Sequence, residues 1–317
     1  MDNVIVTHNL CKTYGRKEAV SGVNMHIRKG AIYGFIGRNG SGKSTTLKLL
    51  SGLANPTGGE ISVFGGTLND ESVRRRIGIL IETAGLEPDK SAYENMMLKA
   101  MMMGIIDSEK EIQELLTKVG LDPKDKKCTK KFSMGMKQRL GIAMALLGGP
   151  DLLLLDEPIN GLDPEGMNEI RSYLLELNEK KGMTILISSH ILGELSKMAT
   201  CFGIIKDGCL IQELTSEELN ARCRDYLYLK IGDAKTAAVI LEQRLGIKDY
   251  EVRPDGEIRI FQEADSAAVT QEMAKEGVDV YSVYAHQQDL EGYFIELMGQ
   301  EEKQTGKAGQ RGGRHHA

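Results

Sequence analysis

Apolar residues between residues 1 and 220 come in short runs separated by polar and glycine-rich segments, a pattern typical of alternating strands and helices. Two of these runs, Asp151–Leu155 and Thr184–Ser188, are apolar on both faces, as the buried strands of parallel sheets are. Residues 91–147 favour helices, interrupted by a polar, lysine-rich loop at Asp122–Lys131. Further strands are predicted at Val4–Asn9, Val23–Ile27, Ala31–Ile36 and Ile77–Ile81. We therefore expect an α/β domain over residues 1–220.

A second pattern begins near residue 225 and contains a hairpin-turn signal at Pro254-Asp255-Gly256. The order βαββαβ predicts a small α+β domain of the ferredoxin-like type over residues 225–298. Residues 300–317 contain almost no apolar side chains and are expected to form a disordered tail. The predicted strands are Tyr226–Ile231, Tyr250–Arg253, Ile258–Phe261 and Val278–Tyr284, and the predicted helices are Ala234–Leu245, Ser266–Glu276 and Asp289–Met298.

The composition narrows the classes of function. Of the 317 residues, 41% are hydrophobic and 27% are charged, which is ordinary for a globular protein. The net charge of -5 argues against a nucleic-acid partner. No apolar run approaches the ~20 residues of a membrane helix, and no signal peptide is visible. If the protein works at a membrane, we expect it to do so through a partner.

Residues 37–44 carry the most specific motif of the chain. They fit the phosphate-binding pattern GxxxxGK[ST] and lie between a predicted strand and a predicted helix. Glycines let backbone N–H groups turn towards phosphate oxygens, Lys43 reaches the β- and γ-phosphates, and the Ser44 hydroxyl binds Mg²⁺. We therefore expect nucleoside triphosphate binding by Gly37, Arg38, Asn39, Gly40, Ser41, Gly42, Lys43, Ser44 and Thr45.

Acidic residues follow a buried strand of four leucines. Asp156 and Glu157 come at the C-terminal end of this strand, where ligands bind in α/β sheets. We expect Asp156 to hold the Mg²⁺ shell and Glu157 to act as the general base towards water. His190 follows the next apolar strand, which places it near the γ-phosphate. The predicted catalytic residues are thus Lys43, Glu157 and His190.

Several further segments resemble the motifs of the ABC ATPases. The sequence FSMGMKQR at residues 132–139 resembles the LSGGQ signature, in a looser form common among exporters, and NGLD at residues 160–163 resembles the D-loop. His190 resembles the switch histidine of this family, and Tyr14 resembles the aromatic residue that stacks on adenine. All of these motifs occur in the family's order over residues 1 to about 220.

This resemblance implies a P-loop ATPase core with a helical subdomain that pairs head to tail with a second copy. Each ATP would lie between the phosphate loop of one copy and the signature of the other, where Ser133 and Gly135 touch the γ-phosphate. One chain carries one set of motifs, so a homodimer is the simplest assembly. The family implies ATP and Mg²⁺ as ligands, and a separately encoded transmembrane permease as a partner. It also implies a location at the cytoplasmic face of a bacterial membrane.

Three departures from the family pattern stand near the expected site. Glu82 follows the strand Ile77–Ile81 where the family has the Q-loop glutamine. A glutamate has a similar shape but is anionic and accepts hydrogen bonds only, so we expect it to contact Mg²⁺ or its water shell. Met134 and Met136 replace a glycine and a glutamine of the signature, and Ile159 replaces a threonine. None of these changes removes a group on the reaction path, so we expect an active ATPase.

The segments at residues 77–85 and 132–143 look like those of the bacitracin and lantibiotic self-protection subgroup, which implies export of, or resistance to, a peptide antibiotic. An importer ATPase is the main alternative, although importers of sugars or metals usually carry a regulatory barrel at the C-terminus. Non-transport ABC ATPases carry either a very long coiled coil or two motif sets. Neither feature occurs in this sequence, and the NKxD motif of a GTPase is absent.

Overall fold

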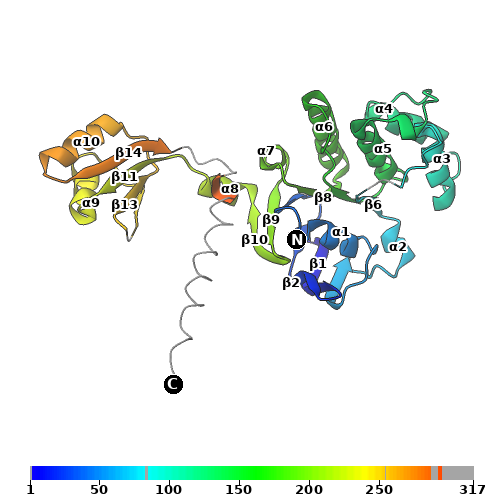
Figure 1. The fold of residues 1–317 in the computed structure, drawn as a ribbon, viewed down its shortest axis with the longest axis horizontal. Helices are drawn as coiled ribbons and strands as arrows, with labels where there is room; N and C mark the ends of the chain where they lie inside the picture. Colours follow the sequence, from blue (N-terminus) through cyan, green and yellow to red (C-terminus); the bar gives the residue numbers. More distant parts are fainter. Residues whose placement is uncertain (1, 83–84, 254, 287–291, 295–317) are drawn as a thin grey trace, which may run out of the picture. The chain divides into compact units, whose positions relative to one another are not determined.

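The computed structural model describes residues 2–82, 85–253, 255–286 and 292–294 of the chain (Figure 1). The chain divides into two compact units, Met1–Ser216 and Glu217–Ala317. Of the predicted last helix, Asp289–Met298, the structure describes only residues 292–294, and these are helical. The predicted tail, residues 300–317, lies outside the described residues. The limits predicted for the two domains, residues 1–220 and 225–298, stay predictions.

The centre of the first unit is a six-stranded sheet in the order β10-β9-β4-β8-β7-β6. Its strands run parallel except β10, which is antiparallel to β9. Every residue of β4, β7 and β8 is buried, which confirms the strands predicted from unbroken apolar runs. The bounds are β4 Ile32–Ile36, β6 Ile77–Leu80, β7 Leu152–Asp156, β8 Thr184–Ser189, β9 Cys201–Lys206 and β10 Cys209–Thr215.

A smaller antiparallel sheet is built around β1, which pairs with β2, β3 and β5. The predicted strand Val23–Ile27 is wrong, because β2 ends at Val23 and the chain turns at Asn24. The Asn24 side chain fixes this turn, accepting from the Asn9 N–H (2.8 Å) and donating to the Gly22 carbonyl (3.0 Å). The bounds are β1 Asn3–Tyr14, β2 Lys17–Val23, β3 His26–Arg28 and β5 Gly58–Val63.

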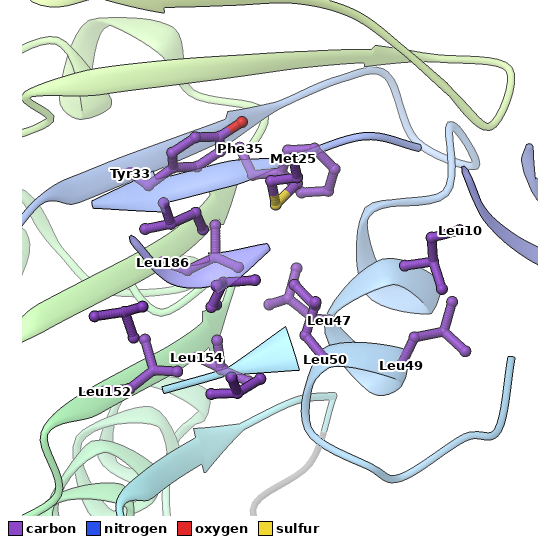
Figure 2. Close-up of a cluster of buried hydrophobic side chains, with 14 of the residues drawn as sticks. Leu10, Met25, Tyr33, Phe35, Leu47, Leu49, Leu50, Leu152, Leu154 and Leu186 are labelled. Carbon is purple, nitrogen blue, oxygen red and sulfur yellow. The ribbon is translucent and has the colours of Figure 1, made fainter. Parts of the chain in front are cut away.

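The hydrophobic core of this unit lies between the two sheets and α1, Lys43–Leu50. Figure 2 shows Leu47 and Leu50 of α1 on the side of the helix nearest Leu154 of β7 and Leu186 of β8. All four side chains are fully buried, and each contributes about 1.5–3 kcal/mol of hydrophobic stabilisation. Because α1 begins inside the phosphate-binding motif, this packing also anchors the loop that precedes it.

Residues 91–147, which were predicted to be helical, contain three α-helices. The predicted loop at Asp122–Lys131 is also present and ends in one 3₁₀ turn. The first of these helices begins with a capping box, in which Ser91 Oγ accepts from the Glu94 N–H and the Glu94 carboxylate accepts from the Ser91 N–H. The bounds are α2 Glu71–Arg74, α3 Ala92–Met103, α4 Glu109–Lys118, the 3₁₀ helix η1 Thr129–Lys131, α5 Met134–Leu146, α6 Pro164–Lys181 and α7 Leu192–Leu195.

The second unit holds a four-stranded antiparallel sheet in the order β12-β13-β11-β14, which confirms the ferredoxin-like prediction. Inward-facing strand residues such as Leu229 and Ile258 share a core with α9 and α10. The last strand lies two residues later than predicted. The bounds are α8 Ser216–Arg222, β11 Tyr226–Ile231, α9 Ala234–Gln243, β12 Tyr250–Val252, β13 Glu257–Ile260, α10 Ser266–Lys275 and β14 Val280–His286.

Candidate functional site

Polar loops follow four neighbouring strands at one edge of the six-stranded sheet, because the C-terminal ends of parallel strands lie at the same side. β4 leads into the phosphate loop, residues 37–43, β8 leads into His190, β7 into Glu157, and β6 into Glu82. The order in space is β4-β8-β7-β6, so the strand that ends at His190 lies between the phosphate loop and the acidic residues. The sheet therefore brings most of the predicted site residues to one edge.

The phosphate loop fits closely against the rest of the unit. Gly42 has a φ of 109°, and a Cβ at this position would lie 2.5 Å from the Ala19 carbonyl oxygen. A Cβ on Gly37 would lie 2.3 Å from Ser41 Oγ and 2.5 Å from the Ile205 carbonyl oxygen. Glycine is therefore required at both positions. Within the described part of the chain, the buried Ser41 Oγ has no hydrogen-bond partner, so its hydroxyl can serve an incoming phosphate.

Lys43 is buried beneath this loop. Its Nζ donates to the carbonyl oxygens of Gly37 (2.7 Å) and Arg38 (3.3 Å) and lies 3.9 Å from Glu157 Oε1. Burial lowers the pKa of Lys43, and the carboxylates of Glu157 and Asp156 oppose this shift. A cation that is shielded from water interacts more strongly with a phosphate than an exposed one does.

A cavity of about 250 Å³ opens beside the phosphate loop. Lys17 and Ala19 of β2 line one side of it, and neither residue was predicted from the sequence. The motif could not reveal them, because their contact with the loop depends on how β2 packs. The full lining is Lys17, Ala19, Asn39, Gly40, Gly42, Lys43, Ser44, Thr45 and Glu157. A polar, glycine-lined cavity with a buried lysine fits a chain of phosphates.

Asp156 and Glu157 lie at the end of β7, beside the end of β8. Asp156 is buried, and its Oδ1 accepts a hydrogen bond from Ser188 Oγ, which itself accepts one from the Glu157 N–H (3.1 Å). His190 Nδ1 lies 2.8 Å from Glu157 Oε2. The Glu157 carboxylate is therefore held between Lys43 and His190. Ser188 stands two residues before His190, but no sequence motif marks it as a site residue.

Glu82 reaches the same edge of the sheet but contacts a different group. Its Oε1 lies 2.5 Å from Lys48 Nζ on α1, and its side chain is 60% exposed. Its backbone φ of 59° lies in the left-handed region, as does that of Glu157. The predicted role of Glu82 as a metal ligand stays a prediction, and the ion pair with Lys48 competes with it.

Tyr14 ends β1 and is half exposed. It pairs across the hairpin with Lys17, which lines the cavity, and Lys12 Nζ lies 4.9 Å from the centre of its ring. The ring is therefore a surface feature near the phosphate loop and not a member of the hydrophobic core. Its half-exposed ring is accessible to a planar ligand.

Ser133 and Gly135 lie in a second group of residues, at the start of α5. Ser133 is the N-cap of this helix, and its Oγ accepts from the Met136 N–H (3.2 Å). The segment that resembles the D-loop packs here, so a Cβ on Gly135 would lie 3.2 Å from the Gly161 carbonyl oxygen. Neither Ser133 nor Gly135 lines the cavity beside the phosphate loop. The structure thus divides the predicted nucleotide-binding residues into two groups.

Comparisons with known proteins agree with the motifs. A family model described as ABC transporter matches residues 20–160. The bacitracin transport ATP-binding protein BcrA of Bacillus licheniformis is 42% identical over 94% of this chain and 98% of its own length. The chain belongs to the ATP-binding proteins of ABC transporters. The resemblance inferred from the signature and the phosphate loop is therefore confirmed.

Further relatives of this ABC protein extend the match. The lantibiotic transport ATP-binding protein SrtF of Streptococcus pyogenes is 48% identical over 65% of this chain and 88% of its own length. A dimeric ATP-binding cassette solved in a post-hydrolysis state with ADP and phosphate has a TM-score of 0.62 and 28% identity. That match covers 67% of this chain and 98% of the solved one. The ABC protein is accordingly an ATPase.

Among the residues that the structure describes, no helix is both long and apolar enough to cross a membrane.

Proposed function

We propose that this ABC protein is the ATPase subunit of an exporter that removes a peptide antibiotic of the bacitracin or lantibiotic class. Similarity to two bacitracin transport proteins over 94% of the chain, and to a lantibiotic transport protein, carries the proposal. A separately encoded permease selects the peptide, and the ATPase binds that permease at the cytoplasmic face of a bacterial membrane. The open antiparallel sheet of the second unit favours an exporter over the importers that end in a barrel.

In this proposal the phosphate loop and Tyr14 hold ATP. Backbone N–H groups of residues 37–45 bind the phosphate oxygens, and the start of α1 adds its positive dipole end. Lys43 neutralises the β- and γ-phosphates from beneath the loop. Tyr14 stacks on adenine, for which its half-exposed ring beside Lys17 supplies a surface.

The donor set fits Mg²⁺, which prefers hard oxygen ligands and binds together with phosphates. The Ser44 hydroxyl lines the cavity, and the Asp156 carboxylate ends the adjacent β7. When bound, Mg²⁺ neutralises negative charge that develops on the phosphates. Glu82 joins this shell, directly or through water, once it leaves Lys48.

Hydrolysis needs a base, and Glu157 is placed to serve as one. Water attacks the γ-phosphorus, its proton passes to Glu157, the bond to the β-phosphate breaks, and ADP leaves. His190 orients the Glu157 carboxylate through their 2.8 Å contact, and Lys43 stabilises the charge on the γ-phosphate. In a head-to-tail homodimer the second copy's signature completes the site, with its Ser133 and Gly135 on the γ-phosphate. Within one chain, Ser133 and Gly135 do not line the cavity beside the phosphate loop, and this separation supports the head-to-tail arrangement.

Antibiotic susceptibility tests the proposal. The full chain is expressed together with its permease in a sensitive bacterium, and the minimum inhibitory concentrations of bacitracin and of a lantibiotic are measured. We expect a several-fold rise for at least one peptide. Glu157→Gln should abolish the rise, whereas Glu179→Gln, at an exposed position of α6, should retain it. Unchanged inhibitory concentrations for both peptides, with normal ATPase activity, would overturn the proposed substrate class.

A further inference from the structure

The backbone at Glu157 is held in an unusual conformation by hydrogen bonds from three parts of the chain. Its φ is 50°, in the left-handed region that a residue other than glycine occupies at a cost in energy. Its N–H donates to the backbone carbonyl and the hydroxyl of Ser188, both at 3.1 Å. Its carbonyl accepts from the Asn160 N–H (3.1 Å) and from Gln138 Nε2 (2.8 Å). These four contacts fix the direction in which the Glu157 side chain leaves the backbone.

Gln138 differs from the other partners because it belongs to α5. Ser188 is the last residue but one of the neighbouring strand β8, and Asn160 follows Glu157 by three residues. α5 starts at Met134, directly after Ser133, so Gln138 stands little more than one helical turn from the signature end of the helix. A helix transmits small shifts along its length as a rigid body. One half-buried amide therefore links the signature end of α5 to the backbone of Glu157 in the same chain.

We propose that Gln138 is a positioning residue that couples the two ATP sites of the dimer. Its hydrogen bond to the Glu157 carbonyl aligns the general base of the chain's own site. In the dimer the signature end of α5 contacts the ATP held by the second copy. The alignment of Glu157 therefore depends on whether that second ATP is engaged. This inference rests on the proposed function, in which Glu157 is the base and the signature acts across the dimer.

The first test separates positioning from folding and from nucleotide binding. Gln138→Leu keeps a side chain of similar size but removes the donor, so the Glu157 carbonyl loses one partner. We expect kcat for ATP hydrolysis by the full chain to fall about tenfold, a part of the ~10²–10⁴-fold that a general base contributes, with KM and the melting temperature little changed. Gln113→Leu makes the same substitution at an exposed position of α4 and should leave kcat unchanged. Equal kcat values for the two variants would overturn the inference.

The second test decides on which site Gln138 acts. Two full chains are joined by a long flexible linker, and one of the two bases is removed by Glu157→Gln. In one arrangement Gln138→Leu stands in the copy that keeps its Glu157. In the other it stands in the copy that carries Glu157→Gln. The first-turnover release of phosphate is then measured for both arrangements.

Action on the chain's own Glu157 predicts opposite results for the two arrangements. Compared with the tandem that carries Glu157→Gln alone, phosphate release should be about tenfold slower in the first arrangement and unchanged in the second. The reverse result, or no difference, would overturn the coupling. Failure of the proposed function itself gives a distinct result, because a tandem with Glu157→Gln in both copies would then hydrolyse ATP at the unmodified rate.

Discussion

Glu82 pairs with Lys48 in this structure, and the proposed function gives its carboxylate a second partner, Mg²⁺. Its carboxylate pairs with Lys48, yet its strand ends next to the strand that carries Asp156. Half-exposed ion pairs contribute about 0–1 kcal/mol, so the pair with Lys48 is weak enough to exchange for a divalent cation. Which partner Glu82 takes should therefore depend on the Mg²⁺ concentration.

Substitutions of Glu82 and Lys48 should shift the Mg²⁺ requirement in opposite directions. Glu82→Gln keeps an oxygen ligand and should retain most ATPase activity, whereas Glu82→Ala should keep ATP binding and lose most turnover. Lys48→Met frees the carboxylate, so half-maximal activity should occur at a several-fold lower Mg²⁺ concentration. The measurement is the ATPase rate against Mg²⁺ concentration. Identical curves for Glu82→Ala and the unmodified chain would exclude Glu82 from the metal shell.

Tyr14 should contribute to nucleotide affinity and little to folding, because its ring is half exposed. Tyr14→Ala should weaken ATP binding by roughly 1–3 kcal/mol, the range of a base–aromatic stack. Tyr14→Phe keeps the ring face and should bind ATP normally. Nucleotide titrations give the affinities, and thermal melts without nucleotide serve as the control. A large loss of melting temperature in Tyr14→Ala with unchanged affinity would contradict the stacking role.

The residues that sequence analysis found and those it missed differ in how their contacts arise. Lys43 and Ser44 belong to a motif whose spacing alone specifies the loop. Gln138 and Ser188 act through hydrogen bonds to residues 19 and 32 positions away, and Lys17 reaches the cavity through β2. Such contacts follow from tertiary packing, which no local pattern encodes.

At the scale of elements, the phosphate loop depends on glycine at positions where both conformation and space exclude other residues. Gly42→Ala would force a positive φ on alanine and push its Cβ against the Ala19 carbonyl. We expect this variant to lose ATP binding while the second unit stays folded. Gly40→Ala is the matched control, because its φ is also positive but no atom lies within 4 Å of the added Cβ.

Isothermal titration with ATP compares the two glycine variants with the unmodified chain. Gly40→Ala should bind ATP measurably, since it bears the conformational strain alone. Equal affinities for the two alanine variants would mean that crowding against β2 plays no part in shaping the loop.

Strands were predicted correctly where the run of apolar residues is continuous, and they were missed at short hairpins. β4, β7 and β8 were found because the buried strands of a parallel sheet read as continuous apolar runs. β9 and β10 were missed, although Asp207-Gly208 between them is a typical hairpin turn. β5 was missed because most of its residues are exposed or half exposed, which leaves little alternation to detect.

For the whole molecule, the proposed function implies that one chain holds an incomplete ATP site, because Ser133 and Gly135 lie apart from the cavity beside the phosphate loop. We expect Glu157→Gln to elute at about twice the mass of the 34.9 kDa chain when ATP and Mg²⁺ are present, and as a monomer with EDTA or ADP. Size-exclusion chromatography with light scattering measures this. Adding Ser133→Arg blocks the signature and should abolish the dimer. A dimer that forms without nucleotide, or that survives Ser133→Arg, would contradict head-to-tail pairing through ATP.

The position of β8 in the sheet has a consequence for the newly made protein. β4 carries the phosphate loop, yet both of its neighbours in the sheet, β8 and β9, lie beyond residue 183. At ~5–20 residues per second, a ribosome needs about seven to thirty seconds to travel from β4 to β8. During that interval the nascent chain displays an apolar strand with neither edge paired, which invites aggregation. We therefore expect chaperones to matter most for this chain while it is only half translated.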